Sequence, residues 1–164
     1  MKIGSKGDYG LRALIDLAEH YESGAIIQAK DIAEREAIPK DYLALIMIDL
    51  RRAGFVDSVR GPGGGYRLTR PPDKMTMGQA LTALDGPITL LDCTADLGFS
   101  ECSLSLRCRM RNVWIEANRA VMAILDATTI ADLCRPPAVA GESDYADKSN
   151  SSDPKMPAGL TFHI

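Results

Sequence analysis

Three of the chain's four cysteines lie within one short segment, DCTADLGFSECSLSLRCRM, which spans residues 92–110. Cys93, Cys102 and Cys108 follow a Cys-x8-Cys-x5-Cys spacing, which matches neither the close pairs of zinc knuckles nor a ferredoxin run. Thiolates are soft ligands for iron–sulfur clusters and for zinc, and they are also redox-active groups. The segment has few large apolar residues, so three buried core cysteines are a poor explanation. We therefore expect cluster ligands, with cluster-free redox thiols, and zinc or structural cysteines, as the alternatives.

The composition sets the context for these thiols. The chain has 164 residues, of which 46% are hydrophobic and 25% charged, as in an ordinary globular protein. It has no apolar run near the roughly 20 residues that span a bilayer, and no secretory signal, which predicts a cytoplasmic protein with no membrane partner. Thiols stay reduced in that compartment, so clustered cysteines favour metal or redox chemistry over disulfides.

Charge is unevenly distributed along the chain. The net charge is −3, yet residues 39–74 carry seven basic side chains against four acidic ones. A locally basic segment inside an acidic protein is compatible with a nucleic-acid interface.

Helical periodicity predicts three helices in the N-terminal half. The expected helices span residues 5–21, 28–38 and 40–54. Ser5 and Asp8 stand in the positions of a capping box at the first helix, Pro39 is well placed to open the third, and Gly54 ends it. Two short helices after a longer one are typical of a helix-turn-helix.

A hairpin follows the third helix. Residues 55–59 and 66–70 alternate like strands, and RGPGGG at 60–65 is a turn. Three helices followed by a glycine-tipped hairpin predict a winged helix, a mainly α fold with a small β-hairpin wing.

The C-terminal half is predicted to mediate dimerisation. A short helix is expected at residues 75–86, and one long helix at 109–133. Its apolar side comprises Trp114, Ala117, Val121, Ile124 and Leu125. At 1.5 Å per residue such a helix, roughly 35 Å long, is too long for this domain to cover, which predicts a symmetric dimer. We expect a winged helix-turn-helix DNA-binding domain at 1–74, a cluster-binding loop and dimerisation helix at 75–135, and a disordered tail at 136–164.

Several of these strings resemble one family. DYGLRALIDLA, YLALIMIDLRRAGFVDSVRGPGGGYRL and ALDGPI, together with the cysteine segment, are similar to the bacterial winged-helix transcription regulators that include IscR, NsrR and CymR. The resemblance covers about residues 1–134. It implies a homodimer that binds a double-stranded DNA operator and is not an enzyme. It also implies a [4Fe-4S] or [2Fe-2S] cluster on Cys93, Cys102 and Cys108 that senses iron–sulfur, redox or nitric oxide status.

Two alternatives to a cluster-dependent regulator stay open. The first is a cluster-free winged-helix regulator that responds through its thiols or to a small molecule. The second is a thiol redox enzyme, against which no histidine lies near the cysteines in sequence and no cofactor motif occurs.

The resemblance also suggests a fourth ligand. IscR-like members place a histidine three residues after the last cysteine, where this chain has Arg111, which cannot ligate. NsrR-like members use an aspartate of the first helix, contributed by the other subunit, and Asp8 matches it. Asp8 could instead simply cap its helix. Cys134 is not expected to ligate within one subunit, because the long helix separates it from Cys108.

The resemblance implies DNA contacts at the wing. Arg60 matches an arginine that relatives insert into the minor groove, where negative potential is concentrated, although it could be a solvated turn residue. Gly61, Gly63 and Gly64 would let the turn approach the DNA backbone closely.

The third helix would lie in the major groove. The expected phosphate contacts are Tyr42, Arg51 and Arg52. Tyr42 could equally be half-buried packing, and Arg52 a solvated cap. At the base-reading positions Asp41 and Ala44 replace a serine and a glutamate of IscR, so Asp41 could accept from cytosine and Ala44 could meet a thymine methyl. Leu45 and Ile48 add apolar surface on the outward side, unless the rest of the protein covers them.

Overall fold

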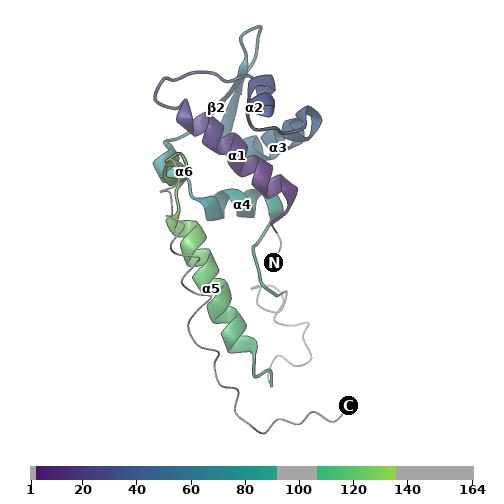
Figure 1. The fold of residues 1–164 in the computed structure, drawn as a ribbon, viewed down its shortest axis with the longest axis vertical. Coiled ribbons are helices and arrows are strands. Elements are labelled where there is room, and N and C mark those ends of the chain that lie inside the picture. Colours follow the sequence, from purple (N-terminus) through teal and green to yellow (C-terminus); the bar gives the residue numbers. More distant parts are fainter. Residues whose placement is uncertain (1–2, 92–106, 136–164) are drawn as a thin grey trace, which may run out of the picture.

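The computed structural model describes residues 3–91 and 107–135. Its elements, in order, are α1 (Ser5–Glu19), α2 (Ala29–Arg35), α3 (Lys40–Arg52), β1 (Val56–Val59), β2 (Gly65–Leu68), the 3-10 turn η1 (Pro72–Lys74), α4 (Met77–Asp85), α5 (Arg111–Ala127) and α6 (Ile130–Leu133). Helices α1–α4 pack together, the β hairpin projects from one end, and α5 extends from the other (Figure 1). The predicted mainly α fold with a hairpin wing is confirmed. Cys93, Cys102 and the tail at 136–164 lie outside the described residues.

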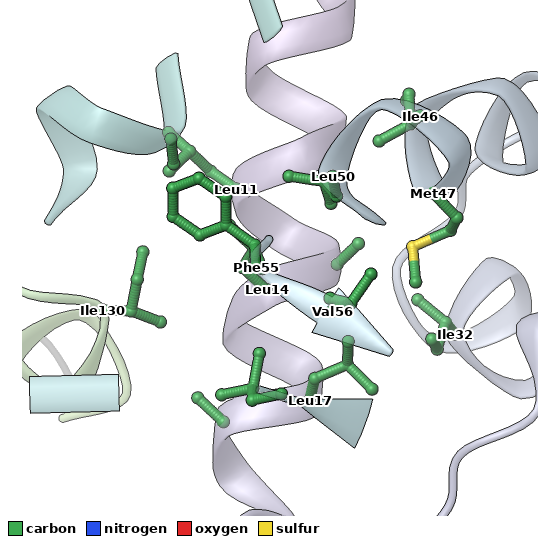
Figure 2. Close-up of a cluster of buried hydrophobic side chains, with 14 of the residues drawn as sticks. Leu11, Leu14, Leu17, Ile32, Ile46, Met47, Leu50, Phe55, Val56 and Ile130 are labelled. Atoms are coloured by element: carbon green, nitrogen blue, oxygen red, sulfur yellow. The ribbon is translucent and has the colours of Figure 1, made fainter. Parts of the chain in front are cut away.

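The core forms where the apolar faces of α1 and α3 meet. Leu11, Leu14 and Leu17 recur on one face of α1 and are nearly inaccessible to solvent. The four α3 residues expected to be buried are all fully buried: Leu43, Ile46, Met47 and Leu50. Figure 2 shows several of these side chains with Phe55 and Val56 from the start of the hairpin. This packing fixes the orientation of α3 relative to the rest of the domain.

An ion pair with a buried carboxylate joins α1 to α2. The Arg35 guanidinium donates to both carboxylate oxygens of Asp16, over 2.7 and 2.8 Å. The side chain of Asp16 is only 1% exposed, whereas that of Arg35 is 43% exposed. The bidentate pair sets where α2, the first helix of the helix-turn-helix, lies against α1.

The expected capping box at the start of α1 is wrong. Gly4 is the N-cap, Ser5 is the first helical residue, and no side chain caps this end. The helix begins earlier because the Gly4 N–H donates to Oδ2 of Asp85 in α4, over 3.1 Å. Asp8 instead forms an ion pair with Arg12, one turn along the helix, at 3.0 Å.

The expected single helix over residues 109–133 is also wrong. The chain leaves helical geometry at Thr128, and α6 begins after Thr129, whose side chain accepts from the Asp132 N–H in a capping box. The extended backbone here pairs with the chain before α4: the N–H of Met77 donates to Thr128 O and that of Ile130 to Met75 O, both over 2.8 Å. These bonds, with the fully buried Ile130 side chain, stabilise the break.

The wing is a two-stranded antiparallel hairpin, in which Val56 pairs with Leu68 and Val59 with Gly65. Ile27, in the loop before α2, extends it through reciprocal backbone hydrogen bonds of 2.9 and 2.8 Å with Tyr66. The base of the wing is therefore held against the helix-turn-helix, while the tip projects freely (Figure 1).

Candidate nucleic-acid interface and cysteine site

The outward face of α3 carries the residues expected to read bases. Asp41, Ala44, Leu45 and Ile48 follow one another at helical spacing and are all exposed. Leu45 is 59% exposed and Ile48 37% exposed. No described residue covers this face, so the alternative in which the rest of the domain buries Leu45 and Ile48 fails for the described part of the chain.

Tyr42 packs against α1. Its ring lies 5.9 Å from that of Tyr9 at an interplanar angle of 80°, an edge-to-face arrangement. The Arg12 guanidinium lies 5.8 Å from the centroid of the Tyr9 ring. The half-buried packing considered for Tyr42 is therefore present, and its proposed phosphate contact stays a prediction.

A cationic edge lies at the C-terminal end of α3. Arg51 donates to Oγ of Ser58 on β1 over 3.2 Å, and Arg52 approaches Asp49 at 3.6 Å with its side chain 76% exposed. Lys6 forms a 2.7 Å ion pair with Asp49, and its hydrogen bond lowers the pKa of that carboxyl. Lys6 was not anticipated. A lysine in the first turn of α1 gives no sequence signal of its partner 43 positions further along the chain.

The wing turn combines an unengaged arginine with close backbone packing. Arg60 is exposed and makes no ion pair with any residue that the structure describes. Gly61 has a φ of +120°, and its carbonyl accepts from the Gly64 N–H over 2.9 Å. A Cβ at Gly64 would collide with the Val59 carbonyl oxygen, so the turn requires glycine there. Gly63 is exposed, with open space around it. The turn thus holds Arg60 at the accessible tip of the wing.

The expected cluster ligands are only partly visible. Cys108 is a free, half-buried thiol three residues before α5, and Asp8 is exposed on α1 with Arg12 as its partner. Across residues 3–91 and 107–135, no group of three or more His, Cys, Asp or Glu side chains could hold a metal. The described chain supplies one soft thiol to such a site, and the other two expected ligands fall in the segment beyond it.

Cys134 has a different environment. Its thiol donates to the Ile130 carbonyl over 3.3 Å and packs against the core. Burial, and secondarily the charge of Glu19, raise the pKa of this thiol, which disfavours the thiolate that a metal needs. This environment favours the expectation that Cys134 is not a ligand.

The segment that carries the cysteines is held to α5 at its entrance. The backbone N–H of Leu90 donates to Oδ1 of Asn118 over 3.0 Å. Cys108 then leads directly into the helix, which begins at Arg111. Both ends of the segment therefore lie at α5. Asn118 was missed because an amide in mid-helix usually indicates only a solvated face.

Helix α5 is only partly covered by the described chain, with Leu125 packed against the core. None of its residues is buried, and Val113, Trp114 and Ile124 are 68%, 38% and 67% exposed. No helix in the described ranges is long and apolar enough to cross a membrane.

Comparison with known proteins gives a consistent result. Residues 3–136 match the model of the Rrf2 family, described as iron-dependent transcriptional regulators. The HTH-type transcriptional regulator IscR of Aliivibrio salmonicida is 37% identical over 133 residues, which cover 81% of this chain and 77% of that protein. Among solved structures, CymR of B. subtilis, titled its global cysteine regulator, superposes with a TM-score of 0.68 at 34% identity, covering 82% of this chain and 96% of CymR. IscR of T. potens gives 0.64 at 29% identity, covering 93% of each chain.

Proposed function

Since this chain belongs to the Rrf2 family of DNA-binding transcriptional regulators, we propose that it acts as a homodimer whose operator binding is set by an iron–sulfur cluster. The observation that carries the DNA-binding part is the pairing of an exposed α3 face with an unengaged Arg60 at the tip of the wing. A helix in the major groove and a wing arginine in the minor groove are complementary ways to read a duplex.

In this proposal each interface residue has a distinct task. Arg51 and Arg52 contact phosphates at the C-terminal end of α3 and position the helix. Tyr42 does the same from the N-terminal end. Arg60 enters the minor groove, and Gly61, Gly63 and Gly64 let the turn approach the DNA backbone. Asp41 and Ala44 face the base edges.

Dimerisation is supported by the exposed apolar side chains of α5. A helix that extends from its own domain gains most if an equivalent helix covers it, and a two-fold axis would also present two recognition helices to a palindromic operator. The proposed division of the chain follows from these roles, with DNA binding in residues 1–74 and cluster binding and dimerisation in 75–135.

The cluster would be held by Cys93, Cys102 and Cys108. Support comes from the soft character of three thiols, the free Cys108 thiol at α5, and the family description as iron-dependent. When bound, a [4Fe-4S] or [2Fe-2S] cluster supplies a group that changes with redox state or nitric oxide, or is lost. Asp8 is the proposed fourth ligand, across the dimer. It would have to exchange its ion pair with Arg12 for the metal.

The DNA-binding roles are tested by measuring operator affinity at matched salt. Arg60→Ala should weaken specific binding by about 1–3 kcal/mol if the arginine occupies the minor groove. Arg135→Ala is the matched control, because Arg135 is an exposed arginine beyond α5 and α6 that pairs locally, with Asp132 at 3.6 Å. Equal affinities for the two variants would remove Arg60 from the interface.

The cluster is tested by anaerobic purification, absorption spectroscopy, and assays for iron and acid-labile sulfide. Cys93→Ala, Cys102→Ala and Cys108→Ala should each strip the chain of iron and sulfide, whereas Cys134→Ala should not. Asp8→Asn should alter the spectrum with little change in apo-protein stability, because the exposed ion pair with Arg12 that it removes contributes little. Protein that binds its operator but never contains iron or sulfide would instead support the cluster-free regulator.

A further inference from the structure

Six consecutive apolar residues, 43–48, form the middle of α3. Three of them, Leu43, Ile46 and Met47, are fully buried. The other three are exposed: Ala44, Leu45 and Ile48. An amphipathic surface helix normally carries polar side chains on its outer face, so an apolar outer face needs a separate explanation.

The polar side chains of α3 that could hydrogen-bond to base edges are confined to its two ends. Asp41 lies in the first turn, and Arg51 and Arg52 in the last. Asp49 is held by Lys6 at 2.7 Å. Residues 43–48 have no nitrogen or oxygen in any side chain, and the weakly accepting sulfur of Met47 is buried, so the middle of the helix cannot read a base edge by donors and acceptors.

We propose that Leu45 and Ile48 select thymine by packing against its 5-methyl group in the major groove. This inference rests on the proposed placement of α3 in that groove. The methyl group is the apolar feature that the major groove offers to a protein, and an aliphatic side chain contacts it without leaving a polar group unsatisfied. Asp41, whose carboxylate only accepts hydrogen bonds, reads the amino group of a neighbouring cytosine.

The charges around the apolar patch favour DNA over a protein as its occupant. Arg51 and Arg52 flank the patch at the end of the same helix, and Arg52 is largely exposed. In a major groove, apolar methyl groups lie beside negatively charged phosphates, so the basic end of α3 would meet phosphates while the patch meets methyl groups.

The spacing of the two side chains predicts the spacing of the thymines. Leu45 and Ile48 are three residues apart, which corresponds to about 4.5 Å along the helix axis. Successive base pairs are about 3.4 Å apart. Each half-site should therefore have thymines at adjacent positions, on either strand, beside a C·G pair.

The experiment first selects operator sequences from a random duplex pool with the full-length protein. Each thymine of a selected site is then replaced by deoxyuridine, which removes only the methyl group. At the positions that Leu45 and Ile48 contact, each replacement should weaken wild-type binding about fourfold, as expected for losing one buried methyl group at ~0.8 kcal/mol. Leu45→Ala and Ile48→Ala should each bind the thymine site more weakly and lose sensitivity to uracil at one position.

Ile26→Ala is the matched control variant. Ile26 is 38% exposed, close to the 37% of Ile48, but lies before α2 and outside the proposed patch. It should keep the full response to uracil. Because the wild-type measurement on modified DNA needs no substitution in the protein, the result does not depend on whether Leu45→Ala folds.

The possible outcomes distinguish a failure of thymine reading from a failure of the proposed operator binding. A wild-type protein that selects an operator but is indifferent to every uracil would overturn thymine reading, leave the regulator intact, and assign the patch to a protein partner. Leu45→Ala that still discriminates thymine from uracil at every position would remove Leu45 from the readout. Failure to select any sequence would count against operator binding itself, and the inference would fall with it.

Discussion

Helices α3 and α5 are both amphipathic, yet they differ in where their apolar faces are covered. Four residues of α3 are fully buried against α1 and the start of the hairpin, within one chain. No residue of the longer α5 is fully buried; Leu125 packs against the core, whereas Val113, Trp114 and Ile124 stay exposed. The inner face of α3 is covered by its own domain, whereas much of the apolar surface of α5 is left uncovered by the described residues.

Because of this difference, the stability of the winged helix and that of α5 should depend differently on protein concentration. The winged helix should unfold with a free energy independent of protein concentration, because its contacts are internal. Any stability that α5 gains from a partner copy should rise with concentration, since association stabilises by mass action. Variants in the two regions should therefore be distinguishable by the concentration dependence of unfolding.

The largest expected effect is in the winged helix, at the ion pair between Arg35 and the buried Asp16 carboxylate. Arg35→Leu leaves the nearly inaccessible Asp16 carboxylate without its two donors, which should cost about 3–5 kcal/mol of unfolding free energy at neutral pH. Asp16→Asn should cost less, about 1–2 kcal/mol, because the half-exposed Arg35 can be hydrated. Urea titrations at two protein concentrations measure both. Equal losses would mean that the carboxylate is not as desolvated as its 1% exposure indicates.

The next effect is on the α5 side. Ile124 is 67% exposed in the single chain, and Ile124→Asp should leave the circular dichroism spectrum intact. If a second α5 covers this position, the substitution removes the free energy of burying an isoleucine, about 1.5–3 kcal/mol. The dimer dissociation constant should then rise by at least tenfold. Sedimentation equilibrium checks this. Glu116→Asp, an exposed acid on the same helix, is the control. An unchanged dissociation constant would place the dimer contact elsewhere.

Sequence periodicity was sufficient wherever burial is completed by neighbouring elements. The buried positions of α3 and of α4, where Ala80, Leu81 and Leu84 are buried as expected, follow from 3.6-residue spacing alone. The hairpin followed from alternation and glycine content. Local patterns succeed here because the 3.6-residue spacing decides which positions face the core, whichever element covers them; α4, for example, packs against α1, far earlier in the chain.

Sequence reasoning failed where a distant contact decides the local structure. Gly4 rather than Ser5 is the N-cap of α1, and its N–H donates to Asp85, 81 positions away. The helix predicted over 109–133 breaks at Thr128 because its backbone pairs with the strand-like residues before α4. The same limit applies to the candidate site: the α3 stripe was evident from spacing, but the ion pair of Lys6 with Asp49 was not.

A smaller effect is expected at the turn between α5 and α6, which connects α5 to the winged helix. Thr129 caps α6 by accepting from the Asp132 N–H over 3.1 Å and donating to its carboxylate over 2.6 Å. Thr129→Ala should cost about 1 kcal/mol, the usual worth of an N-cap, at any protein concentration. Thr128→Ala is the control, because its hydroxyl bonds only to the Ile124 carbonyl behind it. A loss of unfolding free energy that grows at low protein concentration would show that the turn between α5 and α6 takes part in the dimer contact.

The smallest expected effect on stability is at Glu36 in the winged helix, and it depends on pH. Partial burial, and secondarily the charge of Asp16, raise the pKa of Glu36 above its ordinary value. The folded state therefore binds this proton more tightly than the unfolded state, so Glu36 favours folding when protonated and opposes it once ionised. Its penalty sets in as the pH rises from the ordinary carboxyl value through the raised one, and is complete at neutral pH. Glu36→Gln removes the penalty and should stabilise the protein near pH 7 by about 0.5 kcal/mol or less. The gain should vanish in acid, where the wild-type carboxyl is protonated.

Glu34→Gln, at an exposed position on α2, is the matched control and should show no such pH-dependent gain. Because Asp16 contributes to the shift, the gain should be smaller in an Asp16→Asn background. Full additivity of the two changes would exclude Asp16 as a cause of the raised pKa.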